Sequence, residues 1–238
     1  MCMDFSFSFM LKALLAALHY LPTTLLLGFL PLLLGSFLGL IIGLIRFYNI
    51  PVLSSFFKWF VSIFKAIPVI LILLVSYLVS AEFLDSIAET FSWSIRFKDI
   101  DRRFVAIFAL TLYATSSLSE IFRGALKAIP KGQFDAAYSV GLTTRQIIRR
   151  VVIPQVFPIA LPMVNNVLIG LIKASSLVSM VSVVDILNGA LIEANVNYRF
   201  LEAYVAVSLI YWPLCAAIEA VTAWYEKYFN KGKRGQLV

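Results

Sequence analysis

Long uncharged stretches alternate with short basic stretches along this chain of 238 residues. A helix of about 20 apolar residues, rising 1.5 Å per residue, crosses the roughly 30 Å hydrocarbon layer of a membrane. The pattern therefore predicts an all-α membrane protein with five spanning helices, at about residues 21–45, 59–79, 104–118, 156–177 and 203–224. Asp185 interrupts a further apolar piece, 178–191, which we expect to form a short extracytoplasmic helix or a re-entrant turn.

Glycine and proline positions in the first two spans bear on packing. Gly35, Gly39 and Gly43 recur at every fourth position, a spacing suited to close helix contact. Dimerisation through this face is one hypothesis, and a chance stripe in a glycine-tolerant membrane helix is the other. Pro68 lies inside the second expected span, where it would free a backbone carbonyl that a neighbouring helix or a cavity must satisfy.

Composition narrows the class of protein. Hydrophobic residues make up 61% of the chain and charged residues 14%, which excludes an ordinary soluble domain. The net charge of +7 comes from basic residues gathered in particular loops, so it indicates membrane orientation and not nucleic-acid binding. Cys2 and Cys215 show neither a disulfide nor a metal-ligand pattern, and His19 has no nucleophile or paired carboxylates to act with. We expect no catalytic site, no metal site and no enzyme activity.

Lys and Arg are more numerous on one side of the expected spans, in the loop at 120–155 and after the last span. Because cytoplasmic loops are the basic ones, this loop should face the cytoplasm. The N-terminus is then outside and the C-terminus inside. We expect an extracytoplasmic segment at 1–20, a membrane domain at 21–224 and a basic cytoplasmic tail at 225–238.

The polar loop after the third span carries its own helix signals. A first helix is expected at 133–140, ended by Gly141 in the left-handed conformation that favours glycine. Thr143 stands three residues before Gln146, the spacing of a capping box, and begins a second helix that Pro154 should end. This pattern fits a docking element. It also fits a basic helix lying on anionic headgroups, with Gly141 acting only as a cap.

The loop resembles the signature region of the membrane subunits of ABC importers. Asp135-Ala136-Ala137-x-x-x-Gly141 is similar to E-A-A-x-x-x-G, and Val151-Val152-Ile153-Pro154-Gln155 is similar to the I-x-L-P ending, with Asp135 and Ile153 as departures. Several ordered motifs over about sixty residues make a specific signal. Those that resemble the polar-amino-acid permease branch are Glu120-Ile121-Phe122-Arg123-Gly124, Ile129-Pro130-x-Gly132-Gln133, Leu161-Pro162-x-x-x-Asn166 and Lys173-Ala174-Ser175-Ser176-Leu177. The first hundred residues match more loosely, with Lys65-Ala66-Ile67-Pro68 where the family often has Arg-Gly-Thr-Pro.

The resemblance implies a type I importer permease fold, called MetI-like, in a bacterial inner membrane. It implies separate ABC ATPase subunits, a second permease copy or a paralogue, an extracytoplasmic amino-acid-binding protein and surrounding lipid as partners. ATP would bind the ATPase subunit, so this chain needs no cofactor, and it has no Walker A pattern. By the same resemblance the residues that dock the ATPase would be Asp135, Ala136, Ala137, Val140, Gly141, Arg145 and Arg149. Ala136, Ala137 and Val140 would pack into the ATPase, and Gly141 would permit the turn.

The spans hold almost no carboxylates to bind a driving ion, which favours an external energy source. The expected substrate path lies along the fourth span, at Asn166, Gly170, Lys173 and Ser176. In relatives that carry cationic amino acids, carboxylates can follow the motif Asn and the motif Lys, where this chain has Val167 and Ala174. A cationic side chain would lack a partner there, so we expect a neutral or zwitterionic amino acid. The motifs also look somewhat like those of cystine permeases.

A second class of function fits the same pattern. A five-span protein with a basic loop can be a scaffold or sensor component that docks an ATPase without moving solute. That hypothesis predicts no ATP hydrolysis that depends on a binding protein.

Overall fold

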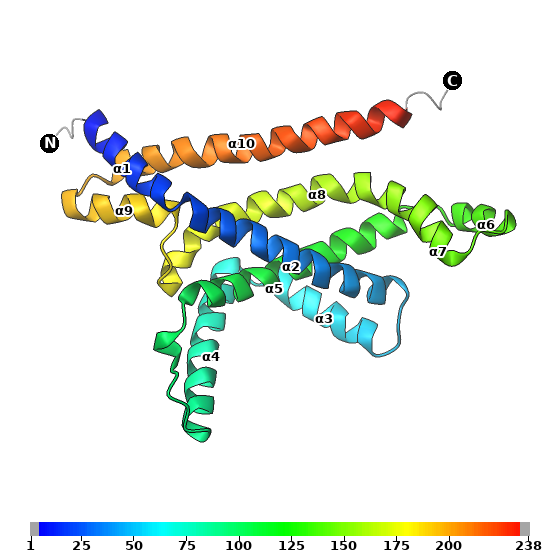
Figure 1. Cartoon of the computed structure of the whole chain (residues 1–238), viewed down its shortest axis with the longest axis horizontal. Coiled ribbons are helices and arrows are strands. Elements are labelled where there is room, and N and C mark those ends of the chain that lie inside the picture. The colour runs from blue at the N-terminus through cyan, green and yellow to red at the C-terminus, as the bar shows by residue number, and fades with distance from the viewer. Residues whose placement is uncertain (1–4, 234–238) are drawn as a thin grey trace.

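The computed structural model describes residues 5–233, with side chains described as far as residue 227. All regular structure in this part of the chain is helical (Figure 1). The elements are α1 (Phe7–His19), α2 (Leu21–Phe47), α3 (Leu53–Ala66), α4 (Val69–Thr90), η1 (Phe97–Asp99), α5 (Arg102–Lys127), α6 (Lys131–Ser139), α7 (Thr144–Ile147), η2 (Ile148–Val152), α8 (Ile153–Ala174), η3 (Ser175–Val181), α9 (Ile186–Asn197) and α10 (Phe200–Lys233). Both η1 and η3 are 3₁₀ helices, and η2 is a π-helical turn.

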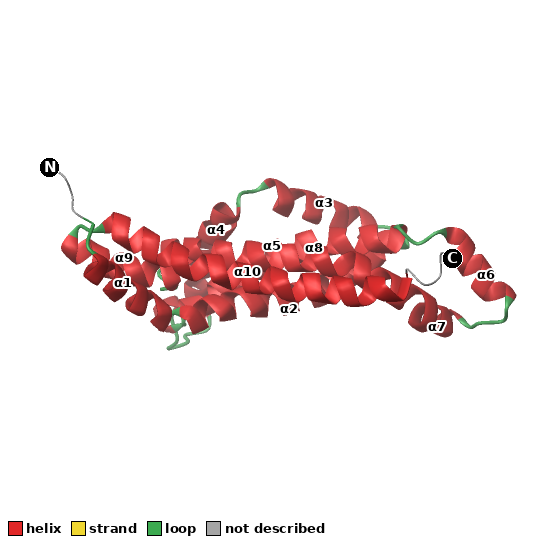
Figure 2. Ribbon diagram, turned by 90° about the horizontal axis from the view of Figure 1, so that it is seen from above, coloured by secondary structure: helices red, strands yellow, loops and turns green. Residues whose placement is uncertain are grey.

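Helices α2, α5, α8 and α10 lie along the long axis of the molecule and form a bundle (Figures 1 and 2). One end of the bundle carries α6 and α7, here called the α6–α7 end, and the other carries α1 and α9, the α1–α9 end. The helical segments that are long and apolar enough to cross a membrane are Leu21–Phe47, Val69–Thr90, Arg102–Lys127, Thr144–Val181 and Phe200–Lys227. The expected all-α membrane protein with five spans is confirmed.

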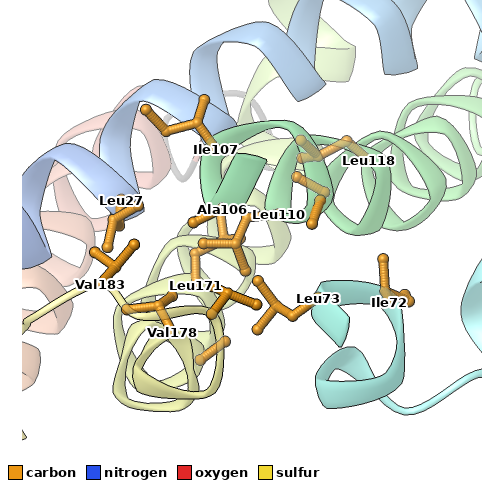
Figure 3. Packing of buried hydrophobic residues seen from close by; sticks show 14 residues of the cluster. Leu27, Ile72, Leu73, Ala106, Ile107, Leu110, Leu118, Leu171, Val178 and Val183 are labelled. Atoms are coloured by element: carbon orange, nitrogen blue, oxygen red, sulfur yellow. The ribbon is translucent and has the colours of Figure 1, made fainter. Parts of the chain in front are cut away.

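The main core lies where α2, α4, α5 and the α8–η3 segment meet. Leu27, Leu73, Leu110 and Leu171 are fully buried and point toward one another from these four elements (Figure 3). Because lipid tails are as apolar as leucine, such helices associate through close packing more than through removal of apolar surface from solvent.

The glycine stripe of α2 packs against α5 of the same chain. A Cβ atom added to Gly35 would lie 2.7 Å from the Ala114 Cβ, and one added to Gly39 would lie 2.9 Å from the Leu118 Cβ, both on α5. These distances leave no room for a side chain, so the two backbones approach as closely as the stripe allows. The hypothesis that this face mediates dimerisation is wrong, because α5 already covers it.

The second span differs from its expected position at 59–79. The chain breaks at Pro68, whose ring disfavours helical geometry at the preceding Ile67, and Ile67 is extended with ψ 131°. Helix α3 runs back from the α6–α7 end, and after the break α4 projects away from the side of the bundle (Figure 1). Residues 80–90, beyond the expected end of this span, are the last turns of α4.

The third span is longer than the expected 104–118. Asp101 caps α5 by accepting a hydrogen bond from the Arg103 backbone N–H at 2.9 Å. Hydrogen bonds from the Arg103 side chain and backbone hold the pKa of the Asp101 carboxyl below its usual value. The helix continues to Lys127, so Glu120 and its motif belong to α5 and not to the loop.

Pro154 does not end the second loop helix. The chain passes from α7 through the π turn of η2 directly into α8, with Pro154 in the first turn of α8. Proline has no N–H to offer the carbonyl four residues earlier and its ring crowds that carbonyl. The π turn η2 includes Arg150, the residue four positions before Pro154. Its wider geometry relieves both the missing hydrogen bond and the crowding of the carbonyl, so the helix continues into the fourth span.

A second apolar cluster joins α1, α9 and α10 at the α1–α9 end. Asp185, fully buried, caps α9 and also accepts a hydrogen bond from the Tyr211 hydroxyl of α10 at 2.9 Å. The apolar piece expected at 178–191 therefore comprises parts of η3 and α9. The expected terminal segments reach beyond the described residues: 1–4 and 234–238 lie outside them, whereas α1 and the end of α10 lie within.

Candidate coupling site and substrate path

Helices α6 and α7 meet at a sharp corner at one end of the molecule (Figure 2). Gly141, between them, has a φ of +78°, a conformation that residues with a Cβ rarely adopt. A capping box starts α7: the Thr143 backbone N–H donates to the Gln146 Oε1 at 2.8 Å, and the Gln146 N–H donates to the Thr143 Oγ1 at 3.4 Å. The expected turn and cap are both present, and the first helix covers Lys131–Ser139 instead of 133–140.

A buried apolar cluster fixes this corner to the bundle. Ala137 of α6 and Ile147 of α7 pack together with Leu126 of α5 and Val152 of η2. Leu44 and Phe47 at the end of α2 pack against the same cluster. A force on the corner is therefore transmitted to α2, α5 and α8 through close-packed side chains, which yield little.

The expected docking residues divide into an exposed set and one buried residue. Val140 is 74% exposed at the corner. Asp135, Ala136, Gly141, Arg145 and Arg149 are exposed as well. Ala137 is only 6% exposed and packs on its own chain, so little of its side chain is left for an ATPase to contact. Sequence reasoning missed Tyr138, which is 52% exposed and whose hydroxyl lies 3.2 Å from the Thr144 hydroxyl across the corner.

Basic side chains continue from the corner toward the bundle. Arg145, Arg149 and Arg150 line a polar hollow of about 460 Å³ together with Gln146. Asp135 forms no ion pair with Arg145 or Arg149 within the described residues. Their positive charge is left available to a partner's carboxylates or to anionic lipid.

An ion-pair network ties the end of α2 to α5 close to the corner. The Arg46 guanidinium donates to the Glu120 Oε2 at 2.8 Å and to the Ser119 hydroxyl at 3.4 Å. Arg123, one turn further along α5, donates to the other oxygen of Glu120. The Arg46 side chain is only 11% exposed, so solvent screens this pair less than a surface pair.

Three of the four expected path residues share one exposed face of the fourth span. Asn166, Gly170 and Lys173 follow one another at spacings of four and three residues, which places them on one side of α8. Asn166 and Lys173 are exposed. Ser176 belongs to η3, and its hydroxyl donates to the Lys173 carbonyl at 2.7 Å. In the described part of the chain, no three His, Cys, Asp or Glu side chains gather as a metal site would require.

Comparison with known proteins places this arrangement in a family. Residues 35–231 match the model of the family described as binding-protein-dependent transport system inner membrane component. The chain is 34% identical to the probable amino-acid ABC transporter permease protein PatM of Vibrio harveyi, over 96% of this chain and 98% of PatM. It is 31% identical to the L-cystine transport system permease protein TcyL of Bacillus subtilis, over 90% and 87% of the two chains.

A solved structure agrees with the fold. The crystal structure of an amino acid ABC transporter with histidines superposes with a TM-score of 0.78 at 26% identity, over 95% of this chain and 100% of that one. The chain belongs to the family of binding-protein-dependent transport system inner membrane components, the membrane subunits of ABC importers. It is a transport permease and a multi-pass protein of the bacterial inner membrane, and the resemblance and fold predicted from its motifs are confirmed.

Proposed function

We propose that this chain forms the membrane path of an ATP-driven amino-acid importer and is driven by a separate ATPase through the α6–α7 corner. The supporting observation is that the corner is exposed at Val140 and Tyr138 yet fixed to α2, α5 and α8 by the cluster around Ala137 and Ile147. A rigid corner with a free outer face can pass the closing motion of an ATPase to the bundle as a rigid-body movement. ATP binds to the ATPase subunit.

The α6–α7 end faces the cytoplasm in this proposal, with the N-terminus outside. Arg145, Arg149 and Arg150 lie at this end. The bias of basic residues toward cytoplasmic loops supports the orientation. An extracytoplasmic binding protein delivers the amino acid to the α1–α9 end, and the chain pairs with a second copy or a paralogue to complete the path. The face with Asn166, Gly170 and Lys173 lines this path.

The substrate is a neutral or zwitterionic amino acid, with cystine the leading candidate. Val167 and Ala174 offer no carboxylate on the fourth span, so a cationic side chain would be buried without a partner. The similarity to TcyL, named as an L-cystine permease, supports cystine, and the name of PatM supports an amino acid in general.

The test is reconstitution of the chain with its ATPase, its partner permease and its binding protein in proteoliposomes. We expect cystine or glutamine, delivered by the binding protein, to stimulate ATP hydrolysis and to accumulate inside the vesicles, whereas arginine does neither. ATPase docking without uptake of any amino acid would instead identify a scaffold or sensor component. Strong arginine uptake would refute the charge argument.

A further inference from the structure

A cavity of about 530 Å³ lies between α3, α5 and α8, in the half of the bundle nearer the α6–α7 end. The side chains that matter for its chemistry are Lys65, Ser117, Glu120, Ile121, Ile159 and Met163. None of these is among the path residues on α8 considered above. Met163 does precede Asn166 by three residues, so the cavity adjoins the exposed α8 face that also carries Gly170 and Lys173.

Two oppositely charged side chains, Lys65 and Glu120, line the cavity, and each can form further hydrogen bonds. Lys65 forms no ion pair or hydrogen bond within the described residues. Glu120 accepts hydrogen bonds from Arg46 and Arg123, but an ionised carboxylate has about four acceptor positions, and its side chain is 32% exposed. The Ser117 hydroxyl has no hydrogen-bond partner within the described residues and can donate or accept. An ammonium group and a carboxylate therefore remain available to a ligand.

The charge balance and the apolar wall favour one class of ligand. Arg46 and Arg123 do not line the cavity and are already paired with Glu120, so Lys65 is the lining cation without a partner among the described residues. One carboxylate on the ligand balances Lys65, and a second cation on the ligand is disfavoured. Ile121, Ile159 and Met163 supply apolar surface. Methionine adapts its shape to irregular ligands and makes favourable contacts through its polarisable sulfur.

We propose that this cavity binds a zwitterionic, neutral α-amino acid at the inner end of the substrate path. Lys65 Nζ donates to the α-carboxylate, the Glu120 carboxylate and the Ser117 hydroxyl accept from the α-ammonium, and the side chain lies against Ile159 and Met163. The assignment rests on the proposed function, because it assumes amino-acid transport with the α6–α7 end inside. It adds a binding site separate from Asn166, Gly170 and Lys173.

The test measures equilibrium binding of radiolabelled glutamine and cystine to the permease–ATPase complex in nanodiscs, with the binding protein omitted. We expect Lys65→Gln to weaken binding at least tenfold, and Met163→Trp, which fills the cavity, to abolish it. Lys58→Gln is the matched control, since Lys58 is exposed on the same helix two turns earlier and does not line the cavity. Each variant must retain the assembled complex and its melting temperature.

Several results would overturn the assignment. It fails if the unmodified complex binds neither probe, or if Lys65→Gln and Met163→Trp bind as tightly as the unmodified chain. Tighter binding of glutamate or arginine than of glutamine would overturn the ligand class. Uptake that is driven by the binding protein and is unchanged in Lys65→Gln would refute this site while leaving the importer function intact, whereas loss of all uptake by the unmodified chain would refute that function.

Discussion

At the scale of single residues, the same residue type, glycine or alanine, has different roles at different positions, depending on which atoms surround its Cβ position. Gly39 must be glycine because α5 lies against it, with the Ser119 backbone nitrogen 2.9 Å from the place of a Cβ. Gly132 in α6 has no atom within 4 Å of that place. Ala136 and Ala137, adjacent in sequence, lie on an exposed and a buried face. Residue type alone therefore does not reveal the constraint.

We expect Gly39→Ala to destabilise the protein by roughly 1–3 kcal/mol, because the added methyl group overpacks the contact between α2 and α5. The measurement is the melting temperature of the purified permease in detergent, or its resistance to denaturant. Gly132→Ala is the matched control. It adds the same methyl group in open space at a helical position, where alanine is favoured over glycine by about 0.5–1 kcal/mol. Equal stability of the two variants would contradict the close packing of α2 on α5.

At the scale of elements, the corner between α6 and α7 depends on one backbone conformation. Gly141 has a positive φ, and its side-chain position is open to solvent. We expect Gly141→Glu to insert into the membrane normally and to lose binding-protein-dependent ATP hydrolysis together with uptake. A glutamate there strains the left-handed turn by about 1–2 kcal/mol and adds a charge at the docking surface.

Gly141→Asn tests whether the defect of Gly141→Glu comes from its strain and charge or from any side chain at this position, since asparagine tolerates the left-handed region and carries no charge. It should retain most of the coupling. The readout is uptake per ATP hydrolysed in proteoliposomes, with insertion checked by sedimentation of the membranes. Normal coupling in Gly141→Glu would remove the basis for assigning the corner to the ATPase.

Elements also show where sequence patterns stop being informative. Hydropathy located the first and last spans closely, because it measures apolar length, and the capping box and Gly141 located the corner through backbone chemistry. The break at Pro68 fell inside a continuously apolar run, so hydropathy joined the end of α3 to the start of α4. No local pattern marked the π turn ahead of Pro154.

At the scale of the whole molecule, the candidate sites depend on contacts between distant segments. Lys65, Glu120 and Met163 come together only because α3 returns along α5, which also packs against α8, and nothing in their spacing along the chain predicts this. The burial of Ala137 likewise follows from the ends of α2 and α5 meeting under the corner. The family motifs predicted the fold and the corner, whereas the cavity required the tertiary structure.

Membrane orientation is the property on which the proposed function most depends. A Cys-free background, made by replacing Cys2 and Cys215, permits single cysteines at two exposed positions, Ser139→Cys in the corner and Lys98→Cys in the segment between α4 and α5. With the corner in the cytoplasm, a membrane-impermeant maleimide should label position 139 only in inside-out vesicles and position 98 only in right-side-out vesicles. The pair is matched because both residues are exposed and lie outside the long helices. Labelling of position 139 from the outer face would show that the orientation is the opposite one, with the corner beyond the reach of any cytoplasmic ATPase.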